Sequence, residues 1–396
     1  MSHKGASHID LSNTEIAFAH LSDVQLRKAI LIFRLMHIGW LVDVLSRLAL
    51  LLLKWKVPGV NALIRKTLFD QFIGGETLSE TSLQIENLWD RGILSALDYG
   101  AEGKTAEVDL DAAHDMFFHA IRFAAQRKGV PVVCIKISAL SANDLLEDVS
   151  GRKELTEEQV KKWKRVEQRL DHLCDEAAQL EVRLFIDAEE SWFQDAIDEL
   201  VHLMMHRYNQ SKVIVYQTYQ LYRHDRLAYL KSSHQHAISA GFLLGAKLVR
   251  GAYLEKENLR ALEKGYPSPI HKTKEDTDRD YDAALVYCVQ HYQQISLCAA
   301  THNRTSCEKL TMLVQHASLP RNHAHLNFCQ LYGMGDDLTF NLAASGFNAT
   351  KYVVFGSIDD VFPYLIRRAD ENDAVTDDFS REYIMRVSEM RRRQNR

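Results

Sequence analysis

The chain has 396 residues, of which 46% are hydrophobic and 26% are charged, and its formal net charge is -5. A chain of this length and composition can bury a large core, and it fits one large domain with an appendage or two ordinary domains. The acidic balance argues against a general nucleic-acid-binding protein, which normally carries a basic excess on one face, so we expect small-molecule chemistry and no nucleic-acid partner.

The first residues and the cysteines indicate an untargeted protein in a reducing compartment. The start, MSHKGASHIDLSNTEIAF, has no basic region followed by an apolar stretch, and the early Asp10 and Glu15 do not suit a transit peptide. The six cysteines are scattered and form no CxxC pair, so neither a zinc ribbon nor a disulfide framework is indicated. We therefore expect a cytoplasmic protein with reduced thiols.

The most membrane-like stretch is ILIFRLMHIGWLVDVLSRLALLLLKWKV, from Ile30 to Val57. Charged residues, among them Arg34, Asp43 and Arg47, interrupt it well below the length that a membrane-spanning helix needs. Its apolar runs alternate with charges, as in amphipathic helices, and we expect residues 1–91 to form a mostly helical N-terminal arm packed on the main domain. The alternative is a peripheral contact of this arm with the inner face of a membrane.

Short apolar runs recur every few tens of residues from Gly92 onward. Each run is continuous rather than alternating, which is typical of parallel strands that are buried on both faces. Segments with helical periodicity lie between them, such as SWFQDAIDELVHLMMHRYN from Ser191. The eight runs are GILSALDYG (from Gly92), VPVVCIKISAL (Val130), EVRLFIDAEE (Glu181), KVIVYQTYQ (Lys212), GAKLVRGAYL (Gly245), ISLCAATHN (Ile295), AHLNFCQL (Ala324) and KYVVFGS (Lys351).

Eight strands alternating with helices predict an α/β fold, a (β/α)8 barrel over residues 92–375, followed by a charged C-terminal helix or tail at residues 376–396. In barrels of this kind the chemistry lies at the carboxyl ends of the strands. Polar residues are therefore expected after the apolar part of each run. They follow nearly every one: Asp98, Lys136, Asp187, Gln217, Arg250, His302 and Gln330.

The segment KLVRGAYLEKE, from Lys247 to Glu257, combines cations, a small pair and an aromatic residue. Gly251 and Ala252 would let a planar or phosphate-bearing ligand approach the backbone, while Lys247 and Arg250 could stabilise negative charge. Tyr253 could pack on a ring. The pattern suits a dinucleotide cofactor, although no GxGxxG follows a first strand, and an ordinary transition from strand to loop is the alternative.

Two further strand ends carry single residues whose role the local pattern leaves open. In IDAEE, Asp187 could hold a base in place, pair with Lys136 or cap the next helix. In ATHN, His302 could be a metal ligand, a base or a residue of a capped loop.

A metal site at His302 would need further ligands. HLMMH (His202, His206) has the spacing of a zinc-protease pair but lacks its glutamate, and it lies on a predicted outer helix. HAH (His323, His325) precedes the seventh predicted strand instead of ending the first. A metal-dependent barrel hydrolase that uses His302, His323 and His325 is the alternative from another enzyme class, and we expect no metal.

The segment FPYLIRRADEN follows the last predicted strand. If it is helical, Ser357 or an aspartate caps the helix and Pro363 lies in its first turns. Tyr364, Arg367, Arg368 and Glu371 then share one face, because they fall at i, i+3, i+4 and i+7. A pair of guanidinium groups is well suited to a carboxylate or a phosphate. The alternative is a solvated helix face with an arginine–glutamate pair.

Together these motifs resemble the proline dehydrogenase family. GGET, IKISAL, IDAEE, YQTYQ, KLVRGAYL, ATHN, QLYGMGD and YLIRRADEN occur in the family's order, from Gly74 to Asn372. LVRGAY and the last motif are highly specific. The resemblance implies a distorted TIM barrel whose final helix lies over the carboxyl ends of the strands, with FAD bound non-covalently.

The resemblance also implies roles for individual residues. Asp187, Lys247 and Lys136 would be catalytic. Proline would contact Lys136, Leu331, Tyr352, Tyr364, Arg367 and Arg368. FAD would contact Ala188, Gln217, Lys247, Arg250, Gly251, Ala252, Tyr253, Thr301, His302, Asn303 and Glu371, and Glu371 would also pair with the arginines of the final helix.

The implied activity is oxidation of L-proline to Δ1-pyrroline-5-carboxylate, with electrons passed to a membrane quinone, as the first step of proline catabolism to glutamate. The pattern resembles the monofunctional branch, so the product would pass to a separate pyrroline-5-carboxylate dehydrogenase. Tyr352 predicts a preference for proline over 4-hydroxyproline, because hydroxyproline-oxidising relatives carry a smaller residue there. A 4-hydroxyproline dehydrogenase and a barrel that binds proline without turnover are the alternatives.

Overall fold

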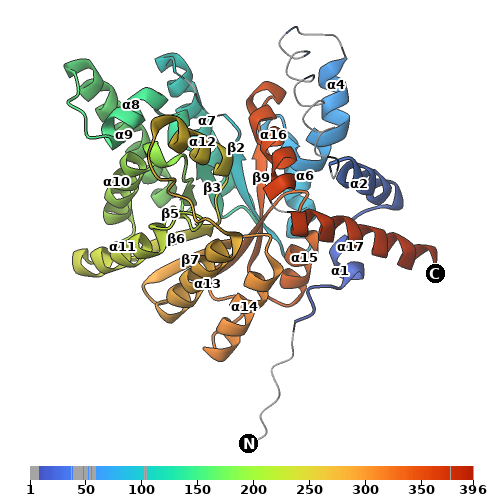
Figure 1. The fold of residues 1–396 in the computed structure, drawn as a ribbon. Coiled ribbons are helices and arrows are strands. Elements are labelled where there is room, and N and C mark those ends of the chain that lie inside the picture. Colours follow the sequence, from blue (N-terminus) through green and yellow to red (C-terminus); the bar gives the residue numbers. More distant parts are fainter. Residues whose placement is uncertain are drawn as a thin grey trace, which may run out of the picture.

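The computed structural model describes residues 9–36, 38, 48, 52, 55, 59–101, 103, 105–374 and 376–395, without the side chains of residues 61, 63 and 369–379. Within these residues, nine strands form one parallel sheet in the order β1-β9-β2-β3-β4-β5-β6-β7-β8, and β8 also pairs with β9. Strands β2 to β9 therefore close into an eight-stranded barrel surrounded by helices (Figure 1). The predicted barrel is confirmed.

Each of the eight predicted apolar runs overlaps one barrel strand, although β6 begins one residue before its predicted run and β9 two residues before its own. The strands are β2 (Leu94–Tyr99), β3 (Val132–Ile135), β4 (Arg183–Ile186), β5 (Val215–Gln220), β6 (Leu244–Val249), β7 (Ile295–Ala300), β8 (Leu326–Leu331) and β9 (Ala349–Phe355). The short strand β1 (Ile73–Gly75) was not predicted. It pairs with Val354 and Phe355, beyond the last residue of β9 that pairs with β8.

The helices cover the outside of the barrel. In the N-terminal arm they are α1 (Thr14–Phe18), α2 (Asp23–Met36), α4 (Val60–Ile64), a π-helical turn (Arg65–Phe69), α5 (Asp70–Phe72) and α6 (Leu78–Trp89). In and after the barrel they are α7 (Glu107–Ala125), a 3-10 turn (Ile137–Ala139), α8 (Asn143–Ser150), α9 (Glu157–Gln179), α10 (Ser191–Tyr208), α11 (Arg226–Ala240), α12 (Leu254–Lys264), α13 (Lys274–Gln290), α14 (Arg304–His316), α15 (Asp336–Ala344), α16 (Ile358–Ala374) and α17 (Thr376–Gln394).

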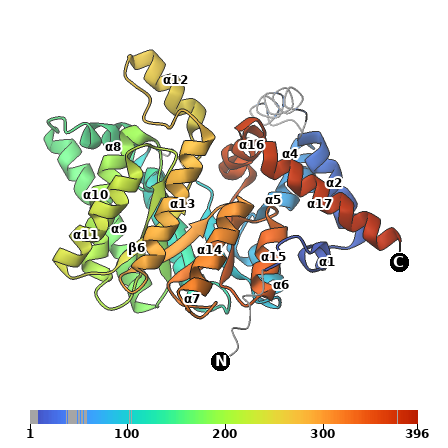
Figure 2. The ribbon, with the colours of Figure 1, turned by 60° about the horizontal axis from the view of Figure 1, so that its bottom comes forward.

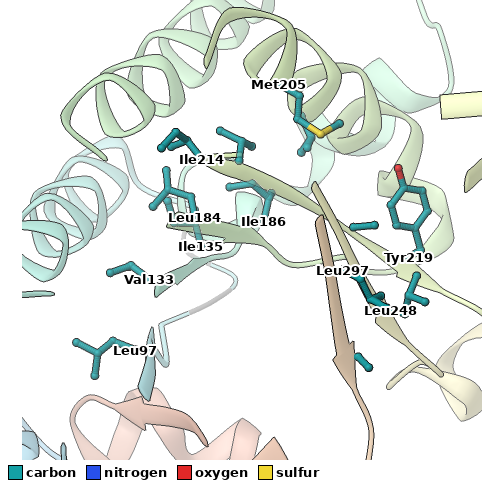
Figure 3. Close-up of a cluster of buried hydrophobic side chains, with 14 of the residues drawn as sticks. Leu97, Val133, Ile135, Leu184, Ile186, Met205, Ile214, Tyr219, Leu248 and Leu297 are labelled. Carbon is teal, nitrogen blue, oxygen red and sulfur yellow. The ribbon is translucent and has the colours of Figure 1, made fainter. Parts of the chain in front are cut away.

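The strands divide the core into two apolar clusters. Outward-facing side chains such as Leu97, Leu184 and Leu297 pack against the surrounding helices (Figure 3). Inward-facing side chains such as Phe185 and Tyr216 form a second cluster that fills the barrel. Because successive strand residues point to opposite faces, most of the apolar runs supply both clusters. The inside of the barrel is thus a packed core, and a cavity lies where its strands end.

Side-chain caps fix where several helices begin. Asn303 accepts a hydrogen bond from the Ser306 N–H at 3.0 Å and so starts α14 directly after the end of β7. Thr156 forms a capping box with Gln159 at the start of α9. Each cap satisfies N–H groups that have no partner inside the helix. The local sequence thereby determines where the chain turns at the rim of the barrel.

The N-terminal arm and the C-terminal helix lie on the same side of the barrel. Helix α17 runs beside α1 and α2, as both views show (Figures 1 and 2). The predicted amphipathic stretch from Ile30 to Val57 is described to residue 36, and beyond it only at isolated positions, so most of that prediction lies outside the described residues. Among the residues that are described, no helix is long and apolar enough to cross a bilayer.

Candidate active site

A cavity of about 250 Å³ opens at the carboxyl ends of the barrel strands. Strand ends form its floor and α16 contributes its upper wall. The structure brings together sixteen of the residues to which the sequence assigned a role: Lys136, Asp187, Ala188, Lys247, Arg250, Gly251, Ala252, Tyr253, Thr301, His302, Asn303, Leu331, Tyr352, Tyr364, Arg367 and Arg368.

Helix α16 brings the predicted face with Tyr364, Arg367 and Arg368 to the cavity, and its start follows the predicted capping. Ser357 caps it, because the Ser357 hydroxyl accepts the Asp360 N–H at 3.2 Å. Tyr364, Arg367 and Arg368 all line the cavity, and the Arg368 guanidinium lies 4.9 Å from the centre of the Tyr364 ring. Arg368 is only 6% exposed. Glu371 belongs to this helix, but its side chain lies outside the described residues.

Opposite α16, two lysines and two carboxylates form a buried chain of charges. Lys136 Nζ lies 3.0 Å from both carboxylate oxygens of Asp98, and 3.9 Å from Asp187 Oδ2. Lys247 Nζ donates to Asp187 Oδ1 at 2.5 Å. All four side chains come from the inner face of the barrel at the ends of β2, β3, β4 and β6. Asp98 is not among the predicted site residues, although the sequence places it at a strand end.

Asp187 is ionised and holds a tyrosine as well as a lysine. The Tyr352 hydroxyl donates to Asp187 Oδ2 at 2.7 Å. Burial raises the pKa of Asp187, but the ammonium groups of Lys247 and Lys136 outweigh burial and hold this pKa below its ordinary value. Burial and then the Asp187 charge raise the pKa of Tyr352 well above its ordinary value. Tyr352 therefore stays protonated and keeps donating to Asp187.

A second part of the cavity is built around Arg250. Its guanidinium bonds Asp278 at 2.7 Å, the Thr301 hydroxyl at 2.6 Å and the Ser306 hydroxyl at 3.0 Å. Next to it, Gly251 has φ +145°, and a Cβ at that position would lie 2.4 Å from the Tyr222 ring. Only glycine therefore fits between Tyr222 and the cavity.

The structure does not bring Gln217 to the cavity. Its amide donates to Asp198 Oδ1 of α10 at 2.6 Å, so the side chain points out of the barrel toward the helices. Its neighbours in β5, Thr218 and Gln220, line the cavity instead. The alternation of strand side chains explains the difference, since residues 218 and 220 share the face that is opposite to that of residue 217. The YQTYQ motif is at the site, but its first glutamine serves the packing of α10.

The histidines do not converge. His302 lies at the end of β7, and its Nε2 accepts the Leu331 N–H at 3.2 Å. His323 and His325 precede β8 at the opposite end of the barrel, where His325 Nδ1 lies 2.8 Å from the Tyr292 carbonyl oxygen. Burial lowers the pKa of His302 well below its ordinary value, and Lys351 lowers it further, so this ring is neutral. Across the described residues, no cluster of three or more His, Cys, Asp or Glu side chains is arranged to hold a metal.

The protonation of Glu189, which follows β4 beside the cavity residue Ala188, makes the stability of the protein depend on pH. Its carboxylate is buried and accepts the Ser138 N–H at 2.9 Å. Burial raises its pKa from 4.5 to about 7, although the Ser138 bond opposes the shift. Between these two values the folded protein binds more protons than the unfolded chain, so stability falls as the pH rises through this window and is constant above it.

We expect Glu189→Gln to remove this pH dependence, because the amide still accepts the Ser138 N–H without a charge. At pH 8 the variant should be more stable by roughly 3 kcal/mol, from about 1.4 kcal/mol per pKa unit. Urea unfolding at pH 5 and pH 8 measures the effect, with Glu158→Gln on an exposed helix face as the control. The same slope with pH in wild type and Glu189→Gln would contradict the prediction.

Comparison with known proteins identifies the family to which this site belongs. A family model described as Proline dehydrogenase matches residues 82–381. Carbapenem antibiotics biosynthesis protein CarD of Pectobacterium carotovorum subsp. carotovorum is 35% identical over 322 residues, which are 81% of this chain and 83% of that protein. Proline dehydrogenase 1, mitochondrial, of Dictyostelium discoideum is 30% identical over 356 residues, which are 79% of this chain and 62% of that protein.

A solved structure shares the fold. The crystal structure of proline utilization A (PutA) from Bdellovibrio bacteriovorus, inactivated by N-propargylglycine, superposes with a TM-score of 0.69 at 20% sequence identity. The match covers 77% of this chain and 32% of that chain. At this identity the likeness supports the barrel architecture, whereas the family assignment depends on the sequence matches.

Proposed function

Because the chain belongs to the proline dehydrogenase family, we propose that it oxidises L-proline to Δ1-pyrroline-5-carboxylate with FAD as cofactor and a quinone as electron acceptor. The observation that carries the proposal is the cavity, where α16 sets two arginines opposite the Asp187–Lys247 pair and Tyr352. A small ring that bears a carboxylate suits this mixture of cations and aromatic walls. The substrate, the cofactor and the acceptor are parts of the proposal.

The proline carboxylate is assigned to Arg367 and Arg368. Lys136 and Lys247 each already bond a carboxylate of the protein at 3.0 Å or less. An arginine offers five N–H donors in a fixed fork, so it can bind a substrate carboxylate in addition to groups of the protein. Lys136 adds a third positive charge at the cavity wall. Fixing the carboxylate also fixes the ring, and such orientation can supply a large part of the lowering of the barrier.

The ring is assigned to the apolar side of the same cavity. Leu331, Tyr352 and Tyr364 line it and belong to one apolar cluster. Tyr352 is held in place by its hydrogen bond to Asp187, so its ring position is fixed before substrate binds. Since Asp187 is ionised and bonded to both Lys247 and Tyr352, we assign it the role of orienting these two side chains. Packing on three sides also excludes water from the reacting carbon.

The residues around Arg250 and Asn303 fit the cofactor. A second depression, of about 400 Å³, shares Asn303 with the cavity and is lined by Lys274, Arg304, Arg381 and the start of α14. Asp278 and Asp282 also line it, but they pair with Arg250, Lys274 and Lys309. A helix N-terminus with nearby cations favours phosphate groups. Adjoining sites for a ring and for phosphates are what an extended dinucleotide requires. When bound, FAD supplies the acceptor for the hydride that leaves the ring carbon next to nitrogen.

Anaerobic reduction by proline tests the function. The purified protein should be yellow, and L-proline should bleach its flavin absorbance in the absence of oxygen. Pyrrolidine, which lacks the carboxylate, is the matched control and should bleach it far more slowly. A colourless protein that does not bind FAD would contradict the proposal. Proline binding without any bleaching would favour a sensor, and stoichiometric zinc without flavin would favour the hydrolase.

Tyr352 gives a prediction about the choice of substrate. Tyr352→Ser should lower the preference for proline over 4-hydroxyproline, measured as the ratio of the two kcat/KM values, by about tenfold, because crowding in a pocket is worth roughly 1 to 3 kcal/mol. Tyr352→Phe is the control, since it removes the bond to Asp187 but keeps the ring. If the ratio does not move in Tyr352→Ser, or moves equally in Tyr352→Phe, crowding by the ring is not the cause.

A further inference from the structure

The loop from Leu331 to Asp336, which connects β8 to α15, forms one wall of the cavity. Leu331 and Met334 line the cavity and belong to the same apolar cluster as Tyr352 and Tyr364. Gly333 has φ +79°, and a Cβ there would lie 2.0 Å from the carbonyl oxygen of Gln71. This β8–α15 loop is therefore pressed between the substrate cavity and the N-terminal arm.

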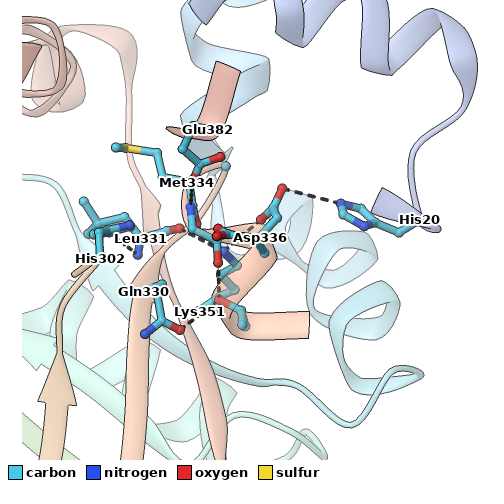
Figure 4. Close-up of polar contacts among 12 residues, drawn as sticks. His20, His302, Gln330, Leu331, Met334, Asp336, Lys351 and Glu382 are labelled. Atoms are coloured by element: carbon cyan, nitrogen blue, oxygen red, sulfur yellow. Dashed lines mark hydrogen bonds and ion pairs between the residues drawn. The ribbon is translucent and has the colours of Figure 1, made fainter. Parts of the chain in front are cut away.

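One buried charge, the ammonium of Lys351, holds the loop from the barrel side (Figure 4). Lys351 of β9 is 1% exposed, and its ammonium donates to the carbonyl oxygens of Leu331, at 3.3 Å, and Met334. The same ammonium lies 2.8 Å from Asp336 Oδ1 at the end of the loop. Lys351 thus bonds two backbone groups of the loop and the side chain that ends it.

Helix α17 holds the loop from the other side. Glu382 accepts the Gly335 N–H and pairs with Arg386. Arg386 Nη2 donates to the Gly333 carbonyl at 3.3 Å and lies 3.2 Å from Asp336 Oδ2. Apart from the Glu382–Arg386 pair itself, these contacts end on the backbone of the β8–α15 loop or on Asp336, which terminates it.

The network costs desolvation energy, which ordinary helix docking would not require. Arg386 is 0% exposed, and Glu382 is 2% exposed. Replacing buried ion pairs by apolar side chains of similar volume often leaves a protein equally stable, so their presence indicates a need for a fixed geometry rather than for stability alone. In this network the charged side chains form hydrogen bonds with the backbone of the β8–α15 loop. Apolar side chains could not form these bonds.

We propose that Glu382 and Arg386 of α17 are positioning residues of the active site. With Lys351 and Asp336, they fix the β8–α15 loop so that Leu331 and Met334 stand at the correct distance from the substrate ring. Helix α17 would then contribute to the geometry of the active site, although it lies outside the barrel. The inference depends on the proposed function, because the ring in question is that of proline.

The test compares two pairs of substitutions on the same helix. Glu382→Gln and Arg386→Met should raise KM for proline by about tenfold or more, with a smaller change in kcat, because misplacing a wall of the site weakens ring contacts by that order. Glu389→Gln and Arg393→Met are the matched controls. Glu389 pairs with Arg393, which bonds Asp23 and the carbonyls of Phe18 and Leu21, and neither touches the loop. Their KM should stay near that of wild type.

A binding measurement separates positioning from folding. Calorimetric titration with tetrahydrofuran-2-carboxylate, a ring carboxylate that the enzyme cannot dehydrogenate at nitrogen, should show the same loss of affinity in Glu382→Gln. Arg386→Lys, which keeps the positive charge, should bind the analogue more tightly than Arg386→Met. Urea unfolding of each variant identifies those that are merely unstable. If Arg386→Met does not fold, Glu382→Gln and Gln71→Ala, which removes another donor to Gly333 at 3.0 Å, decide the matter.

Two outcomes would overturn the inference. Unchanged KM and analogue affinity in a folded Glu382→Gln protein would show that the loop needs no support from α17. Equal losses in the control pair would show that α17 acts only as a structural brace. Absence of proline oxidation by the wild-type protein would instead count against the proposed function, while the titration would still report on the loop.

Discussion

Arg368→Ala is expected to raise KM for proline by about 30- to 700-fold, which corresponds to roughly 2 to 4 kcal/mol. Arg368 is 6% exposed, so a carboxylate bound to it is largely removed from water. Such a contact exists both in the bound substrate and in the transition state. Its loss should therefore appear mainly in KM, with a smaller effect on kcat. Steady-state kinetics with proline as the varied substrate measures the change.

Two further variants sharpen this result. Arg368→Lys keeps the charge but loses the fork of donors, and its KM should fall between those of wild type and Arg368→Ala. Arg321→Ala removes an arginine that bonds the Ser345 carbonyl near the start of β9, away from the cavity, and should leave KM unchanged. Proline kinetics that do not respond to Arg368→Ala would refute the assignment of the carboxylate to α16.

The barrel could be predicted from the sequence because its strands are continuous apolar runs separated by helical periodicity. The predicted cap at Ser357 also has its partner in the structure, since caps depend on residues three positions apart. The short strand β1 could not be predicted in this way. It contains Gly74 and Gly75, and three residues are too few to show a period.

The site was harder to predict where it depends on which face of a strand a residue occupies. Gln217 and Gln220 are alike in type and lie three positions apart in one strand, yet only Gln220 faces the cavity. Lys351 at the start of KYVVFGS gave no signal of a role, because its partners Asp336 and Arg386 come from elements distant in the chain. Contacts of this kind follow from tertiary packing, which local pattern does not encode.

The cost of breaking the buried pair between Lys247 and Asp187 gives the second large effect. Lys247→Met should destabilise the protein by roughly 3 to 5 kcal/mol and abolish measurable turnover, because it leaves Asp187 buried with a charge. Tyr352 would still donate to it, but Lys136 is 3.9 Å away and already bonds Asp98. The exposed pair Lys212–Glu181 is the control: the Lys212 side chain is 66% exposed, and Lys212→Met should cost less than about 1 kcal/mol.

The double variant Lys247→Met/Asp187→Asn decides whether the cost comes from the unpaired charge. With both charges removed, no buried carboxylate is left without its ammonium, because Lys136 still pairs with Asp98. The double variant should therefore be more stable than Lys247→Met alone, although it should stay inactive because the Lys247 ammonium is missing from the cavity. Urea unfolding of the four proteins in this cycle gives the coupling free energy. If Lys247→Met is no less stable than Lys212→Met, or if the double variant recovers nothing, Asp187 is not the buried anion that Lys247 neutralises.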